Sequence, residues 1–197
     1  MSARTPQLVL ASSSTYRAKL LSRLGINFIT RNPLVRESLR VGETAPKRAI
    51  RLAAEKAAAV ATEFSNAVII GSDQVAACGD KILEKPGNAD RAASQLILAS
   101  GRKVDFHTAV SVRNTASGWE DSELVNCSVY FRELTTAEIN SYIQREQPYD
   151  CAGSIKTEGL GIALIERMEG SDATALVGLP LIALFKMLRQ AGVEVLP

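Results

Sequence analysis

Histidine and cysteine are scarce in this chain of 197 residues, and their scarcity limits the metal sites that it can build. There is one histidine, His107, and the three cysteines, Cys78, Cys127 and Cys151, lie far apart with no C-x-x-C pair. This excludes a histidine cluster for zinc or iron and favours free thiols in a reducing compartment over a disulfide framework. A bound metal would need carboxylate ligands, which suit a hard cation such as Mg²⁺ or Mn²⁺.

Strong net charge and long apolar runs are also missing. The 23 Lys and Arg against 21 Asp and Glu leave a formal net charge of +2, with no basic tract for a nucleic-acid-binding surface. The longest apolar run, residues 176–184, is far too short to span a membrane. The amino terminus lacks the apolar stretch of a signal peptide. We therefore expect a cytoplasmic protein that binds neither nucleic acid nor membrane.

Apolar periodicity predicts strands that alternate with helices early in the chain, followed by an antiparallel strand pair. We predict strands at 7–11, 26–30, 67–73, 82–86, 104–114, 122–133 and 162–170, and helices within 12–25, 45–64, 89–100, 136–146 and 180–191. This order is typical of an α/β fold with a mixed sheet. Residues 1–197 are expected to form a single domain, either undivided or split near residue 100 into two lobes with the active-site cleft between them.

The first candidate site is a serine cluster, residues 12–14, at a helix start with Arg17 close behind it. The amino terminus of a helix exposes unpaired N–H groups that attract anions, so Ser12 and Arg17 are candidates for phosphate contacts. No P-loop motif is present. The alternative is a plain serine cap beside a surface arginine, which the sequence alone slightly favours.

Lys56 is a charged residue on a face that is expected to be buried. It shares one stripe of its predicted helix with apolar residues, among them Leu52 and Val60, and most other charges, including Arg48 and Arg51, lie off that stripe. Its ammonium could extend to the rim of the core, as lysines commonly do, or reach over the sheet toward an anionic ligand. Both interpretations stay open.

Asp73 ends the predicted strand 67–73, and ligands of open α/β sheets bind outside such strand ends. Gly71 has no β-carbon and would allow a close approach just before the acid. Lys85 follows a short hairpin and would return to the same edge of the sheet. The alternative is an ordinary turn aspartate, the common fate of Asp after a strand.

The loop 151–161 carries three glycines around Lys156 and Glu158, which suggests a flexible segment that contacts a ligand. Such loops are more often simple turns, so the loop alone is weak evidence. Together the candidates place basic groups, an acid at a strand end and an acid in a loop around one sheet edge. That set suits a phosphorylated substrate with a divalent metal.

Seven segments occur in an order that resembles one known family. They are LVLASSSTYRAKLL, RLAAEKA, IIGSDQV, EKP, the Ser-Gly pair at 100–101, CAGSIKTEG and LVGLPLIAL. They span nearly the whole chain, and their combination resembles the Maf family of nucleoside triphosphate pyrophosphatases. The resemblance implies an elongated mixed β-sheet flanked by helices, similar to the inosine triphosphatase type. It also implies a homodimer and a divalent metal cofactor such as Mg²⁺, Mn²⁺ or Co²⁺.

The resemblance assigns roles to individual residues. Asp73 falls on the family's catalytic acid and would act as general base or metal ligand, with Glu37 as the second metal ligand. The other matched positions are Lys56 and Lys85 in the active site, and Ser12 and Arg17 at the phosphate-contacting start. Two departures are Thr15, where the family usually has proline, and Arg36, where it often has an acid. Arg36 removes a possible carboxylate near the metal.

Tyr16, Gln74 and Glu158 fall on the three specificity positions of the family. The branch that acts on 7-methyl-GTP carries tryptophan, glutamine and glutamate there, and the branch that acts on dTTP and UTP carries arginine, threonine and glutamine. This chain resembles the first branch, which implies hydrolysis of 7-methyl-GTP to 7-methyl-GMP and pyrophosphate. Glu158 would accept from guanine N1–H and N2, Gln74 would donate to O6, and Tyr16 would stack on the methylated ring, with Lys156 as a further substrate-binding residue.

Three alternatives remain open at this point. The chain could be a pyrophosphatase of the dTTP/UTP type, or a non-catalytic nucleotide-binding regulator of septum formation. It could also be a phosphomonoesterase or phosphotransferase that uses the same anion site. The products released from a nucleoside triphosphate separate these classes.

Overall fold

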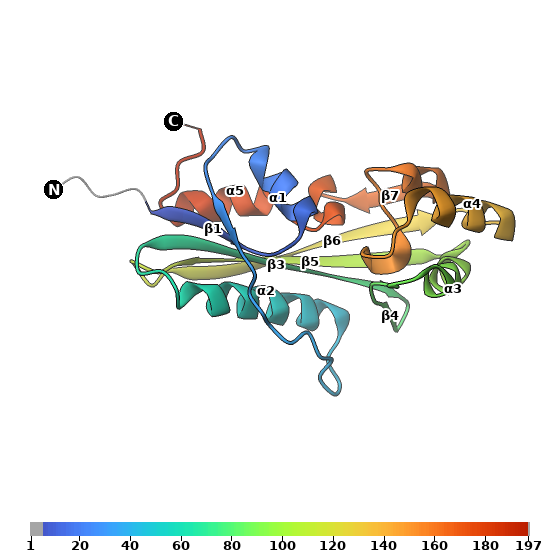
Figure 1. The fold of residues 1–197 in the computed structure, drawn as a ribbon, viewed down its shortest axis with the longest axis horizontal. Coiled ribbons are helices and arrows are strands. Elements are labelled where there is room, and N and C mark those ends of the chain that lie inside the picture. The colour runs from blue at the N-terminus through green and yellow to red at the C-terminus, as the bar shows by residue number, and fades with distance from the viewer. Residues whose placement is uncertain (1–5, 197) are drawn as a thin grey trace.

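The computed structural model describes residues 6–196 and shows one elongated sheet with helices on both faces (Figure 1). The strands are β1 (Gln7–Ala11), β2 (Ile29–Arg31), β3 (Ala67–Cys78), β4 (Lys81–Leu83), β5 (Lys103–Asn114), β6 (Glu120–Phe131) and β7 (Ile165–Gly170). The helices are α1 (Thr15–Ser22), α2 (Ala45–Ala61), α3 (Ala89–Ala99), α4 (Thr136–Glu146) and α5 (Leu181–Gln190), with short 3-10 turns at Ala152–Ser154, Leu160–Leu164 and Ala173–Val177.

The sheet is mixed, as the sequence predicts. Its strand order is β2-β1-β3-β5-β6-β7, and β4 pairs with β3 off this path. β1 is parallel to both β2 and β3, and the other pairs are antiparallel. Figure 1 shows α2 on one face of the sheet and α1 and α5 on the other. The predicted α/β class with a mixed sheet flanked by helices is therefore confirmed.

Most predicted elements form, with differences where tertiary pairing decides the ends. The helix at 136–146 is present with its bounds unchanged because Thr135 and Glu138 make a reciprocal capping box. The strand predicted at 26–30 is shorter and later, because only residues 29–31 lie beside β1. The strand predicted at 162–170 begins at residue 165, after a 3-10 turn.

The position of Asp73 in β3 is the main correction. The sequence predicts that the strand ends at Asp73, but β3 continues five residues further, to Cys78. Its parallel partner β1 stops opposite Gly71, whereas the antiparallel partner β5 accompanies β3 as far as Ala77. The continuing ladder with β5 therefore keeps the chain extended. Asp73 lies just beyond the end of β1, where one side of β3 loses its neighbour.

Small residues let helix α2 approach β3 closely. Ala53 and Ala57 face the sheet, and a β-carbon added at Gly71 would lie 2.2 Å from the carbonyl oxygen of Ala53 and 2.7 Å from the backbone nitrogen of Ala57. The sequence predicts that Gly71 allows a close approach, and the group that approaches is the backbone of α2. This contact sets the height of α2, and of Lys56 on it, above the sheet.

None of the helices within residues 6–196 is long and apolar enough to cross a membrane. The main core gathers apolar side chains of α1, α3, α4 and α5, and two smaller clusters lie beneath α2. One sheet continues on both sides of residue 100. The division of the domain into two lobes stays a prediction.

We predict that Gly71→Ala lowers the free energy of unfolding by about 1–3 kcal/mol or more. The new methyl group would overlap backbone atoms of α2, which cannot rotate aside as a side chain could. Gly71→Val should cost more than Gly71→Ala. Urea denaturation of both variants and the parent chain checks this order. A Gly71→Ala variant as stable as the parent would show that α2 can move away at no cost.

Candidate active site

A cavity of about 570 Å³ opens where β1 gives way to α1. Its lining comes from the serine-rich start of α1, from the loop after β2, from Lys56 on α2, from Lys85 after β4 and from Asp150. A smaller cavity of about 100 Å³ adjoins it, with Arg17, Glu37, Lys56 and Lys85 in both linings. The smaller one also contains Asp73. The two together form the candidate active site.

The start of α1 supplies one wall of the site. The Ser14 hydroxyl accepts from the backbone nitrogen of Arg17 at 3.4 Å, so Ser14 is the helix cap. Arg17 is not a surface residue, contrary to the alternative interpretation. Its Nε donates to the carbonyl of Gly178 at 2.7 Å and its Nη1 to the Ser12 hydroxyl at 3.5 Å. These contacts hold a partly buried guanidinium at the cleft, where desolvation lowers the pKa of Arg17 despite the nearby Asp73 and Glu37 carboxylates.

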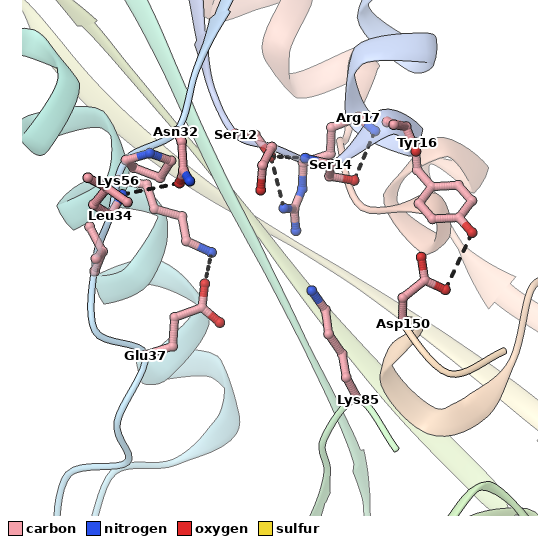
Figure 2. Close-up of a pocket in the computed structure, with 14 residues that line it drawn as sticks. Ser12, Ser14, Tyr16, Arg17, Asn32, Leu34, Glu37, Lys56, Lys85 and Asp150 are labelled. Atoms are coloured by element: carbon pink, nitrogen blue, oxygen red, sulfur yellow. Dashed lines mark hydrogen bonds and ion pairs between the residues drawn. The ribbon is translucent and has the colours of Figure 1, made fainter. Parts of the chain in front are cut away.

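A buried ammonium joins two carboxylates on the opposite wall. Lys56 Nζ lies 2.6 Å from Asp73 Oδ1 and 2.5 Å from Glu37 Oε1 (Figure 2 shows the Glu37 contact). Lys56 and Asp73 are each only 6% exposed. The interpretation that Lys56 extends to the rim of the core is therefore wrong. The lysine points into the site, and Asp73 is tolerated inside the sheet because it is paired there.

The two carboxylates differ in their proton affinity. Burial raises the pKa of Asp73 above its ordinary value, even though Lys56 and Arg17 oppose this. Burial also acts on Glu37, but the hydrogen bond from Lys56 and the charges of Lys56, Lys85 and Arg17 outweigh it and lower the pKa of Glu37. A pair with separated pKa values is typical of acid–base sites. Asp73 is the better proton acceptor, and Glu37 stays ionised.

Lys85 approaches the cavity from β4. Figure 2 shows its ammonium directed toward Ser12 and Arg17, across the cavity from the start of α1. Lys85 makes no ion pair with any residue that the structure describes, unlike Lys56. Its charge is therefore available to a ligand. Arg17, Lys56 and Lys85 surround the cavity, which suits a polyphosphate.

The carboxylates of Asp73 and Glu37 have the chemistry of ligands for a divalent cation. No group of three or more His, Cys, Asp or Glu residues suited to a metal occurs among residues 6–196. Asp73 and Glu37 each give one oxygen to Lys56, and the other oxygen accepts no hydrogen bond from the described chain. Two free carboxylate oxygens beside a cluster of basic side chains fit Mg²⁺, which commonly takes one or two carboxylates plus substrate phosphates.

The predicted base-binding residues are only partly brought together. Tyr16 lines the larger cavity, and its hydroxyl donates to Asp150 Oδ1 at 3.5 Å, on the side away from Lys56 (Figure 2). Lys156 donates instead to the carbonyl of Glu146 at 3.0 Å, and Glu158 is exposed. Neither Lys156 nor Glu158 lines the two cavities. Their roles in substrate binding stay predictions.

Gln74 lines the smaller cavity beside Asp73, but its amide nitrogen is already engaged. It donates to the carbonyls of Ala175 and Leu176 at 2.8 and 3.1 Å, and to the Thr108 hydroxyl at 3.1 Å. The prediction that Gln74 donates to guanine O6 is therefore wrong in this geometry. The amide oxygen is the group that remains for a ligand, and it can only accept.

Several residues of the site are not predicted by the sequence, among them Asp150 and Arg48. Asp150 lines the cavity although nothing in its local pattern marks it. Arg48 was placed away from the core-facing stripe, yet it is buried and lines the smaller cavity. The spacing of Arg48, Leu52 and Lys56 at four-residue intervals contained this signal, because such residues share one helix face.

The Maf-like protein family model matches residues 7–191. The chain belongs to the Maf family. Curated relatives extend the match over almost the whole length. A protein named 7-methyl-GTP pyrophosphatase from Thiobacillus denitrificans is 50% identical over 196 residues, covering 100% of this chain and 98% of the relative. Proteins of the same name from Pseudomonas savastanoi and Polaromonas are 50% and 53% identical, over 96% and 94% of this chain and 99% and 85% of their own.

A solved structure, the Ham1 protein of Staphylococcus aureus, is similar at a TM-score of 0.47 and 14% identity. The aligned region covers 64% of this chain and 71% of the Ham1 chain.

We predict that Asp73→Asn becomes more stable relative to the parent as the pH rises from acid to neutral. The ordinary pKa of an aspartate is 3.8, and the pKa of Asp73 in the folded protein is higher. Between these two values the unfolded chain has released the Asp73 proton and the folded chain still holds it. The free energy of unfolding of the parent therefore falls as the pH rises through this range. Asparagine has no such loss. Urea denaturation across this pH range measures the difference.

Asp105→Asn is the control with the opposite sign. Burial alone would raise the pKa of Asp105, but the hydrogen bond from Ser128 and the ion pair with Lys103 outweigh it and lower that pKa. Its ionised form therefore stabilises the fold above pH 3.8, and Asp105→Asn should lose stability relative to the parent as the pH rises. Parallel curves for the two variants would contradict the assignment of Asp73 as a desolvated acid.

Proposed function

We propose that this Maf-family chain hydrolyses 7-methyl-GTP to 7-methyl-GMP and pyrophosphate and so removes a modified nucleotide from the pool. The observation that carries the proposal is the buried Lys56–Asp73 pair with the half-exposed Glu37 beside it, which faces Arg17 and Lys85 across one cavity. Relatives of that name share half of the sequence over nearly the whole chain.

The reaction needs a water molecule to attack the α-phosphorus while pyrophosphate leaves with increasing negative charge. Asp73 is the group suited to accept the proton of that water, because burial raises its pKa. Arg17 and Lys85 stabilise charge on the phosphate oxygens, and Ser12 offers a hydroxyl at the same wall. Lys56 keeps Asp73 in position, and its ammonium limits the rise in the pKa of Asp73 because it stabilises the charged carboxylate.

The free carboxylate oxygen of Glu37 would hold a divalent cation such as Mg²⁺, Mn²⁺ or Co²⁺ together with the substrate phosphates. The free oxygen of Asp73 would serve either as a second ligand of that cation or as the base. Bound there, the ion would supply positive charge that neutralises the triphosphate. Arg36 is exposed and the next residue, Glu37, still reaches the site, so a carboxylate at position 36 is not needed for this pair. Thr15 forms the first residue of α1, so the helix starts without proline.

The base would lie on the Tyr16 side of the larger cavity. Methylation at N7 gives the guanine ring positive charge, and stacking of a cation on an aromatic face contributes about 0.5–2 kcal/mol. Asp150 and Tyr16 line that side of the cavity. Lys156, on the loop that also carries Glu158, lies next to the Tyr16 hydroxyl. A neutral pyrimidine gains no cation–π contribution. The homodimer and the cytoplasmic location expected from the sequence remain part of this proposal.

A panel of ordinary and methylated nucleoside triphosphates, assayed for pyrophosphate with and without added divalent metal, tests the proposal. We expect pyrophosphate and a nucleoside monophosphate as products, metal dependence, and the highest kcat/KM for 7-methyl-GTP. GTP should follow, and dTTP and UTP should be much poorer, because only the methylated purine carries the ring charge.

Each alternative has its own outcome in that panel. Equal or higher efficiency on dTTP or UTP would contradict the base assignment and leave a pyrophosphatase of the other branch. Release of orthophosphate alone would indicate a phosphomonoesterase. Tight binding without any product would indicate a nucleotide-binding regulator. Full activity after exhaustive chelation would contradict the metal.

A further inference from the structure

Arg48 is a buried cation that the proposed chemistry does not use. It lies in the first part of α2, two turns before Lys56 and on the same helix face, with Leu52 between them. Its side chain is only 7% exposed, and it lines the smaller cavity together with Lys56 and Asp73. A guanidinium cannot lose its charge to escape burial, so its position needs a reason.

The guanidinium connects two segments that carry active-site residues. Arg48 Nη1 lies 2.6 Å from Glu84 Oε1, and Glu84 immediately precedes Lys85. Arg48 Nη2 donates to the backbone carbonyl of Glu37 at 2.9 Å. One planar group therefore touches the loop after β2 and the end of the β3–β4 hairpin at the same time, and each contact is adjacent to a charged group of the cleft.

The contacts of Glu37 show why this second attachment matters. Lys56 holds the Glu37 carboxylate, and Arg48 holds its backbone, so both ends of the residue are attached to α2. The loop 32–43 otherwise consists largely of exposed residues, among them Leu34, whose φ of 48° lies in the left-handed region. Arg51 also attaches this loop to α2, through the Ser38 carbonyl and Glu43. What Arg48 adds is a direct link from Glu37 to the hairpin segment that carries Glu84 and Lys85.

Stability alone is a poor explanation for this arginine. Arg48 Nε is buried and has no hydrogen-bond partner within residues 6–196, and an unsatisfied buried donor costs about 1–3 kcal/mol. Its one charged partner, Glu84, is 47% exposed in its side chain, so solvent screens that ion pair. The unpaired donor costs stability, and the two hydrogen bonds of the guanidinium fix the geometry of the segments that they join.

We propose that Arg48 is a positioning residue that holds Glu37 and Lys85 at their places on opposite sides of the active-site cleft. This proposal rests on the pyrophosphatase function above for its kinetic consequence, but the coupling of the two segments can be measured without turnover. Misplacement of reacting groups by about 1 Å costs about 10²-fold in rate, so the effect should be large.

Arg48→Met, which keeps the apolar stem and removes the guanidinium, is the central variant. We expect kcat on 7-methyl-GTP to fall by about 10- to 100-fold with a smaller change in KM, because substrate still finds Arg17 and Lys56. Arg48→Lys should recover part of the loss, since one ammonium keeps the charge but cannot make both contacts in the same geometry. Arg48→Lys is also the variant to measure if Arg48→Met fails to fold.

Arg132→Met is the matched control. Arg132 also joins a carboxylate and a carbonyl from two segments, with Glu138 Oε1 at 2.8 Å and the oxygen of Ala163 at 2.7 Å, but it lines neither cavity of the active site. It should lose stability without losing kcat, measured at a temperature where every variant is folded. An Arg48→Met kcat equal to that of the parent or of Arg132→Met would overturn the positioning role.

Amide hydrogen exchange, followed by mass spectrometry, supplies the readout that needs no activity. Arg48→Met should exchange faster than the parent in both segments, 32–43 and 81–87, and Arg132→Met in neither. Unchanged exchange in these two segments would overturn the proposal even if the parent chain proves inactive on every nucleotide. If the parent chain is inactive on every nucleotide but Arg48→Met still exchanges faster in both segments, the positioning role of Arg48 is supported. The missing activity would then refute the proposed function alone.

Discussion

The ion pair between Lys56 and Asp73 is the interaction on which the rest of the site depends. A carboxylate in the middle of a strand would cost several kcal/mol if it were left unpaired, and burial already raises its pKa. The ammonium of Lys56, 2.6 Å away, compensates enough of that cost to keep the acid near ionisation. The same ammonium holds Glu37 from a different segment, so one buried charge joins a helix, a strand and a loop.

The fold provides the place for this pair through two features of β3. The parallel neighbour β1 ends opposite Gly71, so the residues that follow have an open side toward the serine-rich turn. Gly71 itself admits the backbone of α2, which brings Lys56 down to the level of the strand. The serine-rich start of α1, the basic end of the β3–β4 hairpin and a buried acid then face one cavity. The match to the Maf family, over residues 7–191, includes all of these segments.

Local chemistry made much of this structure predictable from the sequence. The capping box at Thr135 and the alternation of helices and strands follow from short-range rules. The extent of β3 does not, because it is set by β5, which lies some 35 residues further along the chain. The burial of Arg48 depends on Glu84 and on the carbonyl of Glu37, and no periodicity within α2 reveals those partners. The engaged amide of Gln74 likewise depends on carbonyls a hundred residues away.

The most direct test of the account is the turnover of Asp73→Asn compared with its affinity for nucleotide. The change removes one charge at nearly constant shape and leaves Arg17 and Lys85 in place, so nucleotide binding measured by calorimetry should persist. The account predicts that kcat falls by about 10²- to 10⁴-fold, as for the loss of a general base. A folded variant that hydrolyses 7-methyl-GTP within a few-fold of the parent rate would contradict it, and Asp73 would then be a structural partner of Lys56 alone.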